Sequence, residues 1–148
     1  DLETKSWTRP AERMKAGKPF RVPLSPRCIA LLRQVRKISG QDGLLFPGQK
    51  PGKPLSNNIF LITLRRMGKK CTGHGFRSTF RDWAAEKTNF SRQVCEMALA
   101  HTVADRTEAA YLRGDLFDKR RELMDTWAEY VTTDPDAKVV TLRASDAA

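Results

Sequence analysis

The chain has 148 residues, a length that suits a single domain. It carries 27 lysines and arginines against 17 aspartates and glutamates, and the resulting net charge of +10 indicates an acidic partner such as nucleic acid or an anionic membrane. No apolar run approaches the ~20 residues that span a bilayer, the opening residues are polar and unlike a secretory signal, and the three widely spaced cysteines and two histidines argue against disulfides and against a structural zinc site.

Residues 5–24 are predicted to form a small antiparallel sheet. Residues 7–8 favour one strand, residues 16–19 ("AGKP") a turn, and the alternating residues 20–24 a second strand, in which Pro23 fits a sheet edge or a strand end. A hairpin of two strands is marginal in water, so we expect a partner strand to precede the first residue and the chain to be part of a longer protein.

Helix signals dominate the rest of the chain. Ser25 in the capping position and Gly40 at the end bound a first helix, and Ser56 and Gly68 bound a second. Residues 41–55, which are rich in glycine and proline, are predicted to form an exposed loop between them.

Three further capping positions follow. Thr72 is predicted to begin a third helix, Ser91 a fourth and Asp115 the last one, with a short helix around Tyr111 before it. The predicted apolar faces of these helices are, in chain order, Ile29, Leu32, Val35 and Ile38; Phe76, Phe80, Trp83 and Ala84; Val94, Met97 and Ala98; and Leu116, Leu123, Met124, Trp127 and Val131.

The predicted fold class is mainly α with a small antiparallel β-sheet near the N-terminus, an α+β arrangement. Residues 1–133 would form the domain, with the sheet at 5–24 and a helical core at 25–133. Residues 134–148 are small and polar apart from "VVTL" (139–142), and we expect a tail that is mobile or docked on a partner through this candidate strand.

The charge is unevenly distributed. Residues 1–53 hold twelve basic and four acidic side chains and residues 65–81 six basic and none acidic, whereas residues 115–136 hold seven acidic and three basic ones. One strongly basic part and one less basic part are typical of a protein that binds a phosphate backbone through one face. A solubilising helix end would explain the cations at 65–70, but not Arg77 in the first turn of the next helix, where the helix dipole disfavours a cation.

His74 and Arg77 lie three positions apart in "TGHGFRSTFRDWAAE" (72–86), at a helix N-terminus whose free backbone N–H groups favour an anion. An arginine fork donates two parallel hydrogen bonds to phosphate oxygens. Taken singly, His74 could be a capping or surface residue, His101 a helix C-cap and Tyr111 a core aromatic. The ordered set of HxxR, LxH and a tyrosine ten residues later is much rarer than any of its parts.

This set, together with "ERMKAGKPFRVPLS" (12–25), "TEAAYLR" (107–113) and "DKRRELMDTWAEY" (118–130), resembles the catalytic domain of tyrosine site-specific recombinases, the phage integrase family, and above all its prophage-type integrases. The resemblance spans roughly residues 7–130. It implies the integrase catalytic-core fold, in a C-terminal catalytic domain that lacks its N-terminal side, and a role in prophage integration or excision. It also implies double-stranded DNA as the partner, a homotetramer on DNA, no metal or other cofactor, and a cytoplasmic, nucleoid-associated bacterial protein, in agreement with the reduced cysteines.

The resemblance also assigns chemical roles. Tyr111 would attack a DNA phosphodiester and form a 3′-phosphotyrosyl link. Arg77 would hold the non-bridging oxygens and stabilise the charge that grows on them. His74 would take or share the tyrosine proton, and His101 would hydrogen-bond a phosphate oxygen.

In the family, a lysine on the strand hairpin protonates the leaving 5′-oxygen; Lys15 matches it best, with Lys18 as the alternative. The family's second arginine, upstream of the hairpin, has no match, because Arg9 and Arg13 are poor candidates, so residues 1–148 alone are expected to be inactive or nearly so. Two alternatives are a DNA-binding module with a degenerate site, against which the intact His74, Arg77, His101 and Tyr111 speak, and an enzyme like a type IB topoisomerase, against which the small size and the prophage-like motifs count. The cations expected to contact DNA are Lys18, Arg65, Arg66, Lys69, Lys70 and Arg81.

Overall fold

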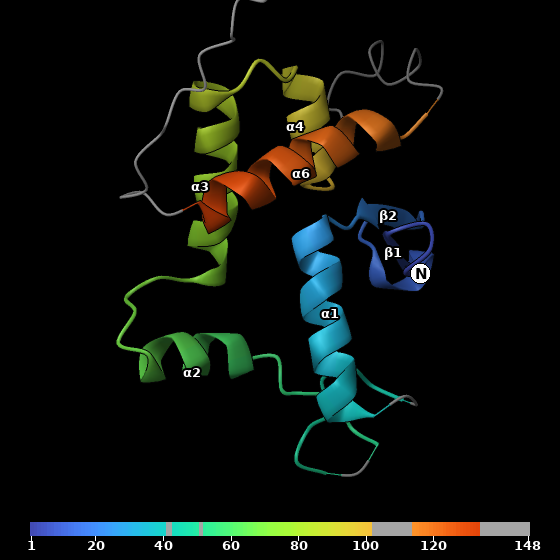
Figure 1. The fold of residues 1–148 in the computed structure, drawn as a ribbon, viewed down its shortest axis with the longest axis vertical. Helices are drawn as coiled ribbons and strands as arrows, with labels where there is room; N and C mark the ends of the chain where they lie inside the picture. The colour runs from blue at the N-terminus through green and yellow to red at the C-terminus, as the bar shows by residue number, and fades with distance from the viewer. Residues whose placement is uncertain (41–42, 51, 102–113, 134–148) are drawn as a thin grey trace, which may run out of the picture.

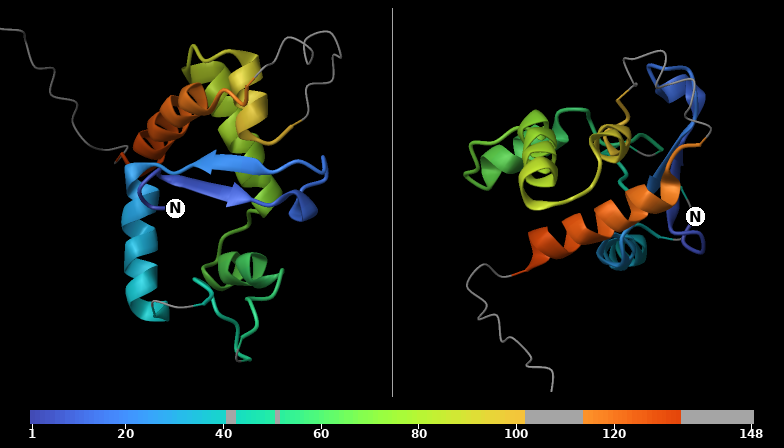
Figure 2. Two further views of the ribbon diagram at one scale, coloured as in Figure 1. Left: turned by 90° about the vertical axis from the view of Figure 1, so that its right-hand side faces the viewer. Right: turned by 90° about the horizontal axis from the view of Figure 1, so that it is seen from above.

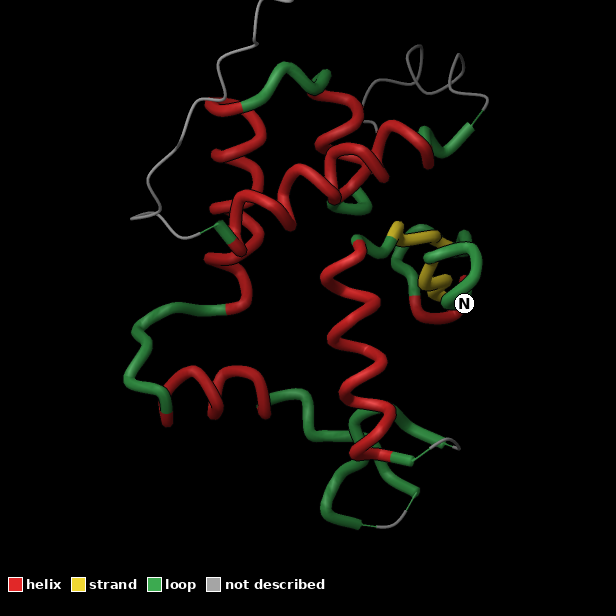
Figure 3. Tube along the Cα trace, in the orientation of Figure 1, coloured by secondary structure: helices red, strands yellow, loops and turns green. Residues whose placement is uncertain are grey.

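A computed structural model describes residues 1–40, 43–50, 52–101 and 114–133. Helices dominate these residues, and the one sheet has two antiparallel strands (Figure 3), which confirms the predicted mainly helical class with a small sheet near the N-terminus. The elements, in chain order, are β1 (Ser6–Arg9), the 3-10 helix η1 (Ala11–Arg13), β2 (Phe20–Pro23), α1 (Pro26–Ser39), α2 (Ile59–Arg66), α3 (Gly73–Lys87), α4 (Arg92–Ala98) and α6 (Phe117–Thr132).

Helix α6 lies at the centre of the arrangement. It contacts α4, β2 and α1, and α3 packs against α4. Figure 1 shows α6 crossing in front of α3 and α4, with the strand hairpin below its N-terminal end. In the view from above in Figure 2, α6 runs between the α3/α4 pair and α1. Helix α2 lies apart from this group, near the lower ends of α1 and α3 (Figure 1).

The hairpin pairs Ser6 with Pro23 and Arg9 with Phe20. Pro23 is the last residue of β2, as predicted for a residue that donates no ladder hydrogen bond. The predicted turn at 16–19 lies within a longer connection from residue 10 to residue 19, which contains η1.

Three of the predicted N-caps are confirmed. The side-chain oxygens of Ser25, Thr72 and Ser91 accept hydrogen bonds from the backbone N–H groups three residues ahead, at 3.2, 3.1 and 3.4 Å. Each of these bonds satisfies one of the free N–H groups at the start of its helix.

Two predicted N-caps are wrong. Ser56 accepts a hydrogen bond from the backbone N–H of Asn58 at 3.2 Å, and α2 begins after Asn58 instead. Asp115 does not cap α6, whose N-cap is Leu116. The Asp115 carboxylate is instead paired with the side chains of Arg21 and Arg120.

The core lies where α3, α4 and α6 meet. It consists of Phe80, Trp83 and Ala84 of α3, Val94 and Cys95 of α4, and Leu123 of α6. Trp127 of α6 packs edge-on against Phe80, with 5.4 Å between the ring centroids, and lies 4.9 Å from Trp83.

Three residues predicted on apolar faces are exposed. Ile38 is 88% exposed at the end of α1 that points away from α6 (Figure 1). Phe76 is 48% exposed because it lies in the first turn of α3, beyond the core, where its ring meets Phe60 of α2 with 5.7 Å between centroids. Val131 is 52% exposed in the last turn of α6.

The predicted short helix around Tyr111, Tyr111 itself, and the predicted tail at 134–148 with its strand at 139–142 lie outside the described residues. Among the helices that the structure describes, none is both long and apolar enough to cross a membrane.

Candidate active site

The first turn of α3 presents the His74–Arg77 pair. Thr72 caps this helix by accepting a hydrogen bond from the Gly75 N–H. The N–H groups of Gly73 and His74 find no acceptor in the described part of the chain, which leaves them available to an anion. The His74 side chain is exposed, and Arg77, one turn further along, is half-buried.

Arg77 joins α3 to the end of α4. Its Nη2 donates a hydrogen bond of 2.6 Å to the backbone carbonyl of Leu99, the residue that follows α4. Because a guanidinium has five N–H donors, this bond leaves capacity for an anion. The bond holds Arg77 against the turn from Leu99 to His101.

His101 is held in that turn through Glu96. The His101 backbone N–H donates to the Glu96 carbonyl at 3.0 Å, and Ala100 between them adopts a left-handed conformation with φ 54°. His101 Nδ1 lies 2.5 Å from one carboxylate oxygen of Glu96. Arg81 Nε donates to the other oxygen at 2.7 Å.

The pKa of Glu96 is lowered from its ordinary value, first by the hydrogen bond to His101 and then by Arg81, although burial opposes the shift. The carboxylate is therefore ionised near neutral pH. Because the folded chain binds this proton more weakly than the unfolded chain, the network stabilises the fold above the ordinary pKa of a glutamate and loses this contribution as the pH falls through the lowered pKa.

The predicted general acids are not brought to this network. Lys15 and Lys18 are exposed in the connection between β1 and β2. No hydrogen bond or ion pair within the described ranges joins either lysine to α3 or α4.

Arg120 anchors the hairpin to α6. Its side chain is fully buried; Nε donates to the Asp115 carbonyl and Nη1 to the Arg21 carbonyl of β2, both at 2.7 Å. Burial lowers the pKa of Arg120, and the nearby Asp115 charge opposes this. The Phe20 and Phe117 rings lie 5.0 and 5.6 Å from the guanidinium carbon, close enough for a cation–π contribution.

The Asp115 carboxylate, which is paired with Arg120, also bonds a second arginine. The guanidinium of Arg21 donates to both of its carboxylate oxygens, at 3.0 and 3.1 Å. Asp115 follows Tyr111 by four residues. Asp115 and strand β2 are therefore both fastened to Arg120 of α6.

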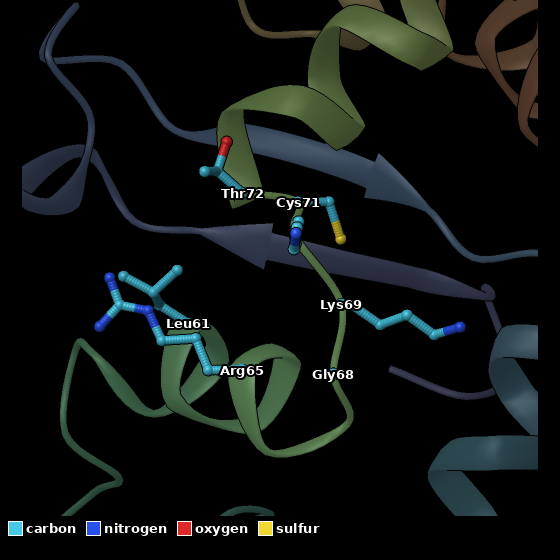
Figure 4. A pocket seen from close by; sticks show the side chains of 7 residues that line it. Leu61, Arg65, Gly68, Lys69, Cys71 and Thr72 are labelled. Carbon is cyan, nitrogen blue, oxygen red and sulfur yellow. The ribbon is translucent and has the colours of Figure 1, made fainter.

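A basic hollow of about 360 Å³ opens between α2 and α3. Figure 4 shows Arg65 and Lys69 extending away from each other on its two sides. Two cations that diverge in this way suit two separate phosphates better than one. The residues that line the hollow are Leu61, Arg65, Gly68, Lys69, Lys70, Cys71 and Thr72.

The amino-acid sequence is similar to those of prophage-encoded proteins. It is 32% identical over 143 residues to prophage integrase IntA of Escherichia coli K12; the aligned part makes up 95% of this chain and 34% of the relative. It is 37% identical over 133 residues to prophage integrase IntZ of the same organism; the aligned part makes up 88% of this chain and 33% of the relative. It is 34% identical over 149 aligned positions to the integrase of Enterobacteria phage P4; the aligned part makes up 88% of this chain and 34% of the relative. The chain belongs to the phage integrase family.

The chain spans about a third of the length of these integrases. No family model matches the sequence, and no solved structure matches the fold. Membership of the integrase family therefore rests on the whole-chain similarity to these prophage and phage proteins.

Within this family member, the structure brings together some of the predicted site residues. Arg77 is bonded to the carbonyl of Leu99, two residues before His101, and His74 lies one turn from Arg77 on α3. Arg81, predicted to contact DNA, is paired with Glu96 and its side chain is 28% exposed. The other cations predicted to contact DNA are exposed: Lys18, Arg65, Arg66, Lys69 and Lys70.

Glu96 and Arg120 were not among the residues predicted from the sequence. Glu96 is the one acidic residue of the helix that ends just before His101, and this position could have singled it out. Arg120 lies four residues after Leu116 and three before Leu123, so helical spacing places it on the apolar face. The described residues contain no cluster of side chains that could hold a metal ion.

Proposed function

We propose that this chain is part of the catalytic domain of an integrase that cuts and rejoins DNA at specific sites, in prophage integration or excision, through a 3′-phosphotyrosyl intermediate. Residues 1–133 would belong to the catalytic domain, with the integrase core fold, and residues 134–148 would form a tail. One observation carries the proposal: Arg77 is bonded to the turn that ends at His101, in a chain similar to prophage integrases over most of its length.

The proposed reaction is a transesterification at phosphorus. The Tyr111 oxygen forms a bond to the phosphorus while the bond from phosphorus to the 5′-oxygen breaks. The phenol loses its proton, and the leaving oxygen gains one and becomes a 5′-hydroxyl. A phenol of pKa about 10 is a weak nucleophile at neutral pH, so it needs a proton acceptor and positive charge around the phosphate.

Each remaining group has a proposed part in this reaction. Arg77 holds the non-bridging oxygens through the donors that Leu99 leaves unused, and stabilises their growing charge. His101 donates a hydrogen bond to a phosphate oxygen, and His74 takes or shares the tyrosine proton. Lys15, or Lys18 in its place, protonates the 5′-oxygen.

The proposed partner is double-stranded DNA, on which the full-length protein would assemble as a homotetramer. The basic side chains around the hollow between α2 and α3 would contact successive phosphates of the backbone. Arg81 would contribute less to DNA binding than the exposed cations, because Glu96 already neutralises it. The cations proposed to contact DNA are Lys18, Arg65, Arg66, Lys69 and Lys70.

The test is a DNA substrate that is nicked near the cleavage position, so that a short fragment diffuses away and the covalent complex accumulates. The full-length protein is expected to give a protein–DNA adduct on a denaturing gel, and Tyr111→Phe, which lacks only the hydroxyl, is expected to bind the DNA without forming it.

Other outcomes would support other functions. An adduct that persists in Tyr111→Phe removes Tyr111 from the reaction. Site-specific binding without an adduct by the unmodified protein would support a DNA-binding module. Relaxation of supercoiled DNA without any site preference would support a topoisomerase-like enzyme.

Residues 1–148 alone are expected to form the adduct about a thousandfold more slowly than the full-length protein, or not at all. None of these residues matches the second arginine that the family uses on the phosphate. The measurement is the single-turnover rate of adduct formation by each of the two proteins at saturating DNA. Efficient strand exchange by residues 1–148 would refute this part of the proposal.

A further inference from the structure

Glu96 lies at the centre of the contacts that hold His101. We propose that Glu96 is a positioning residue for catalysis: its carboxylate holds the proton of His101 on Nδ1 and thereby directs Nε2 to the phosphate. This inference rests on the proposed function, but the arrangement of the two side chains can be measured without any cleavage. The evidence is the geometry of the carboxylate, the backbone of the turn and the chemistry of the donors.

Each oxygen of the Glu96 carboxylate has a side-chain nitrogen within hydrogen-bond distance. One lies 2.5 Å from His101 Nδ1, and the other accepts a hydrogen bond of 2.7 Å from Arg81 Nε. The Glu96 side chain is 25% exposed and the Arg81 side chain 28%, so the pair is partly shielded from water. Two bonds at fixed positions restrict the rotation of the carboxylate, and one bond to Nδ1 restricts the rotation of the imidazole.

The backbone of the turn supports the same arrangement. The Glu96 carbonyl accepts from the N–H groups of both Leu99 and His101, at 3.1 and 3.0 Å. From the other side, Arg77 donates to the Leu99 carbonyl. Arg77 and Arg81 are four residues apart on α3 and therefore share one helix face. Glu96 thus holds both the main chain and the ring of His101 against the helix that carries Arg77.

The chemistry of the donors determines where the proton lies. An ionised carboxylate only accepts hydrogen bonds, so His101 Nδ1 must carry a proton when it bonds Glu96. Nε2 is then the ring nitrogen that remains for the substrate. When the ring also carries a proton on Nε2, that nitrogen donates a charge-assisted hydrogen bond to a phosphate oxygen while Nδ1 stays bonded to Glu96.

Glu96→Gln tests this with almost no change in shape. Arg81 can only donate, so the glutamine oxygen is expected to stay on Arg81 and the amide NH2 to face His101. An NH2 group cannot accept from Nδ1–H, so His101 is expected to keep a proton only on Nε2 and to bond the phosphate as a neutral donor, which is weaker than a charged one. We expect the single-turnover rate of adduct formation by the full-length protein to fall about tenfold to a hundredfold, with DNA affinity within twofold of the unmodified protein.

A second substitution distinguishes positioning from a merely structural role. In the double variant Glu96→Gln, Arg81→Met the amide can turn its oxygen to His101, which allows the proton to return to Nδ1. Part of the rate lost in Glu96→Gln is then expected to return. If Glu96 only stabilises the fold, removing Arg81 as well would lower the rate further. Glu86→Gln, an exposed carboxylate on α3, is the matched control and should leave the rate unchanged.

The proton position is read directly from ring-nitrogen chemical shifts in full-length protein labelled with 15N-histidine, with His101→Gln to assign the signals. We expect a protonated Nδ1 in the unmodified protein and an unprotonated Nδ1 in Glu96→Gln. An unprotonated Nδ1 in the unmodified protein, or a Glu96→Gln rate within twofold of it, would overturn the inference. If the unmodified protein forms no adduct, the proposed function fails, and the nitrogen shifts still decide how Glu96 holds His101.

Discussion

Replacing Arg77 with alanine is expected to lower the rate of covalent adduct formation by the full-length protein about a thousandfold. Two contributions are lost together. The guanidinium no longer neutralises the charge that grows on the non-bridging oxygens, and the bond from Nη2 to the Leu99 carbonyl no longer holds the turn before His101. Single-turnover cleavage of the nicked substrate at saturating DNA measures the loss.

Arg77→Lys separates these two contributions. A lysine can still donate to the Leu99 carbonyl, but as a point charge it cannot form two parallel bonds to a phosphate. We expect this variant to fold and bind DNA like the unmodified protein and yet to cleave at least about a hundredfold more slowly. A rate within tenfold of the unmodified protein for Arg77→Ala would show that Arg77 does not act on the phosphate.

Replacing Arg120 with alanine is expected to lower the local free energy of unfolding of β2 and α6 by about 3 to 5 kcal/mol, the cost of removing one partner from a buried ionic contact. The substitution leaves the carbonyls of Arg21 and Asp115 without their donor and opens a cavity beside Phe20. Hydrogen exchange, measured by mass spectrometry on peptides that cover β2 and α6, reports this change in the full-length protein.

Lys119→Ala is the matched control for this substitution. Lys119 is the exposed neighbour of Arg120 on α6, and its replacement is expected to change the same exchange energies by less than about 0.5 kcal/mol. Arg120→Met should fall between the two, because its side chain fills much of the cavity but donates no hydrogen bond. Unchanged protection of β2 in Arg120→Ala would mean that Arg120 does not anchor the hairpin.

Local sequence signals were sufficient for the elements whose ends are decided by near neighbours. Ser25, Thr72 and Ser91 cap their helices through a backbone N–H three residues away, and a pattern of that length is visible in the sequence. Asp115 carries a similar signal but does not cap α6, because Arg21, 94 residues away, and Arg120 occupy its carboxylate. A competition of this kind depends on tertiary structure and leaves no local pattern.

Helical periodicity identified the faces but not how far the packing extends along them. Phe80 and Trp83 are buried, whereas Phe76 on the same predicted stripe lies one turn outside the reach of α4 and α6. Ile38 is exposed for the same reason, at the end of α1 that no other helix covers. The length of an apolar stripe is set by its neighbours, which the sequence of one helix does not contain.

The candidate site combines a pattern visible in the sequence with contacts that only the fold creates. The order of HxxR, LxH and tyrosine, together with the family resemblance, supplied the identity and roles of His74, Arg77 and His101. The structure added how two of them are joined, through Leu99 and Glu96. Spacing along the chain could not predict this link, because Arg77 and Leu99 are 22 residues apart and only the packing of α3 against α4 brings them together.

The most direct test of the central claim is to identify the residue that becomes linked to DNA. The covalent complex of the full-length protein with the nicked substrate would be digested with protease and nuclease, and the nucleotide-bearing peptide sequenced by mass spectrometry. The account predicts a phosphotyrosyl link at Tyr111, whose yield falls with substitution of Arg77 or His101. A link at any other residue, or a yield at Tyr111 that neither substitution changes, would contradict a single site built from these three side chains.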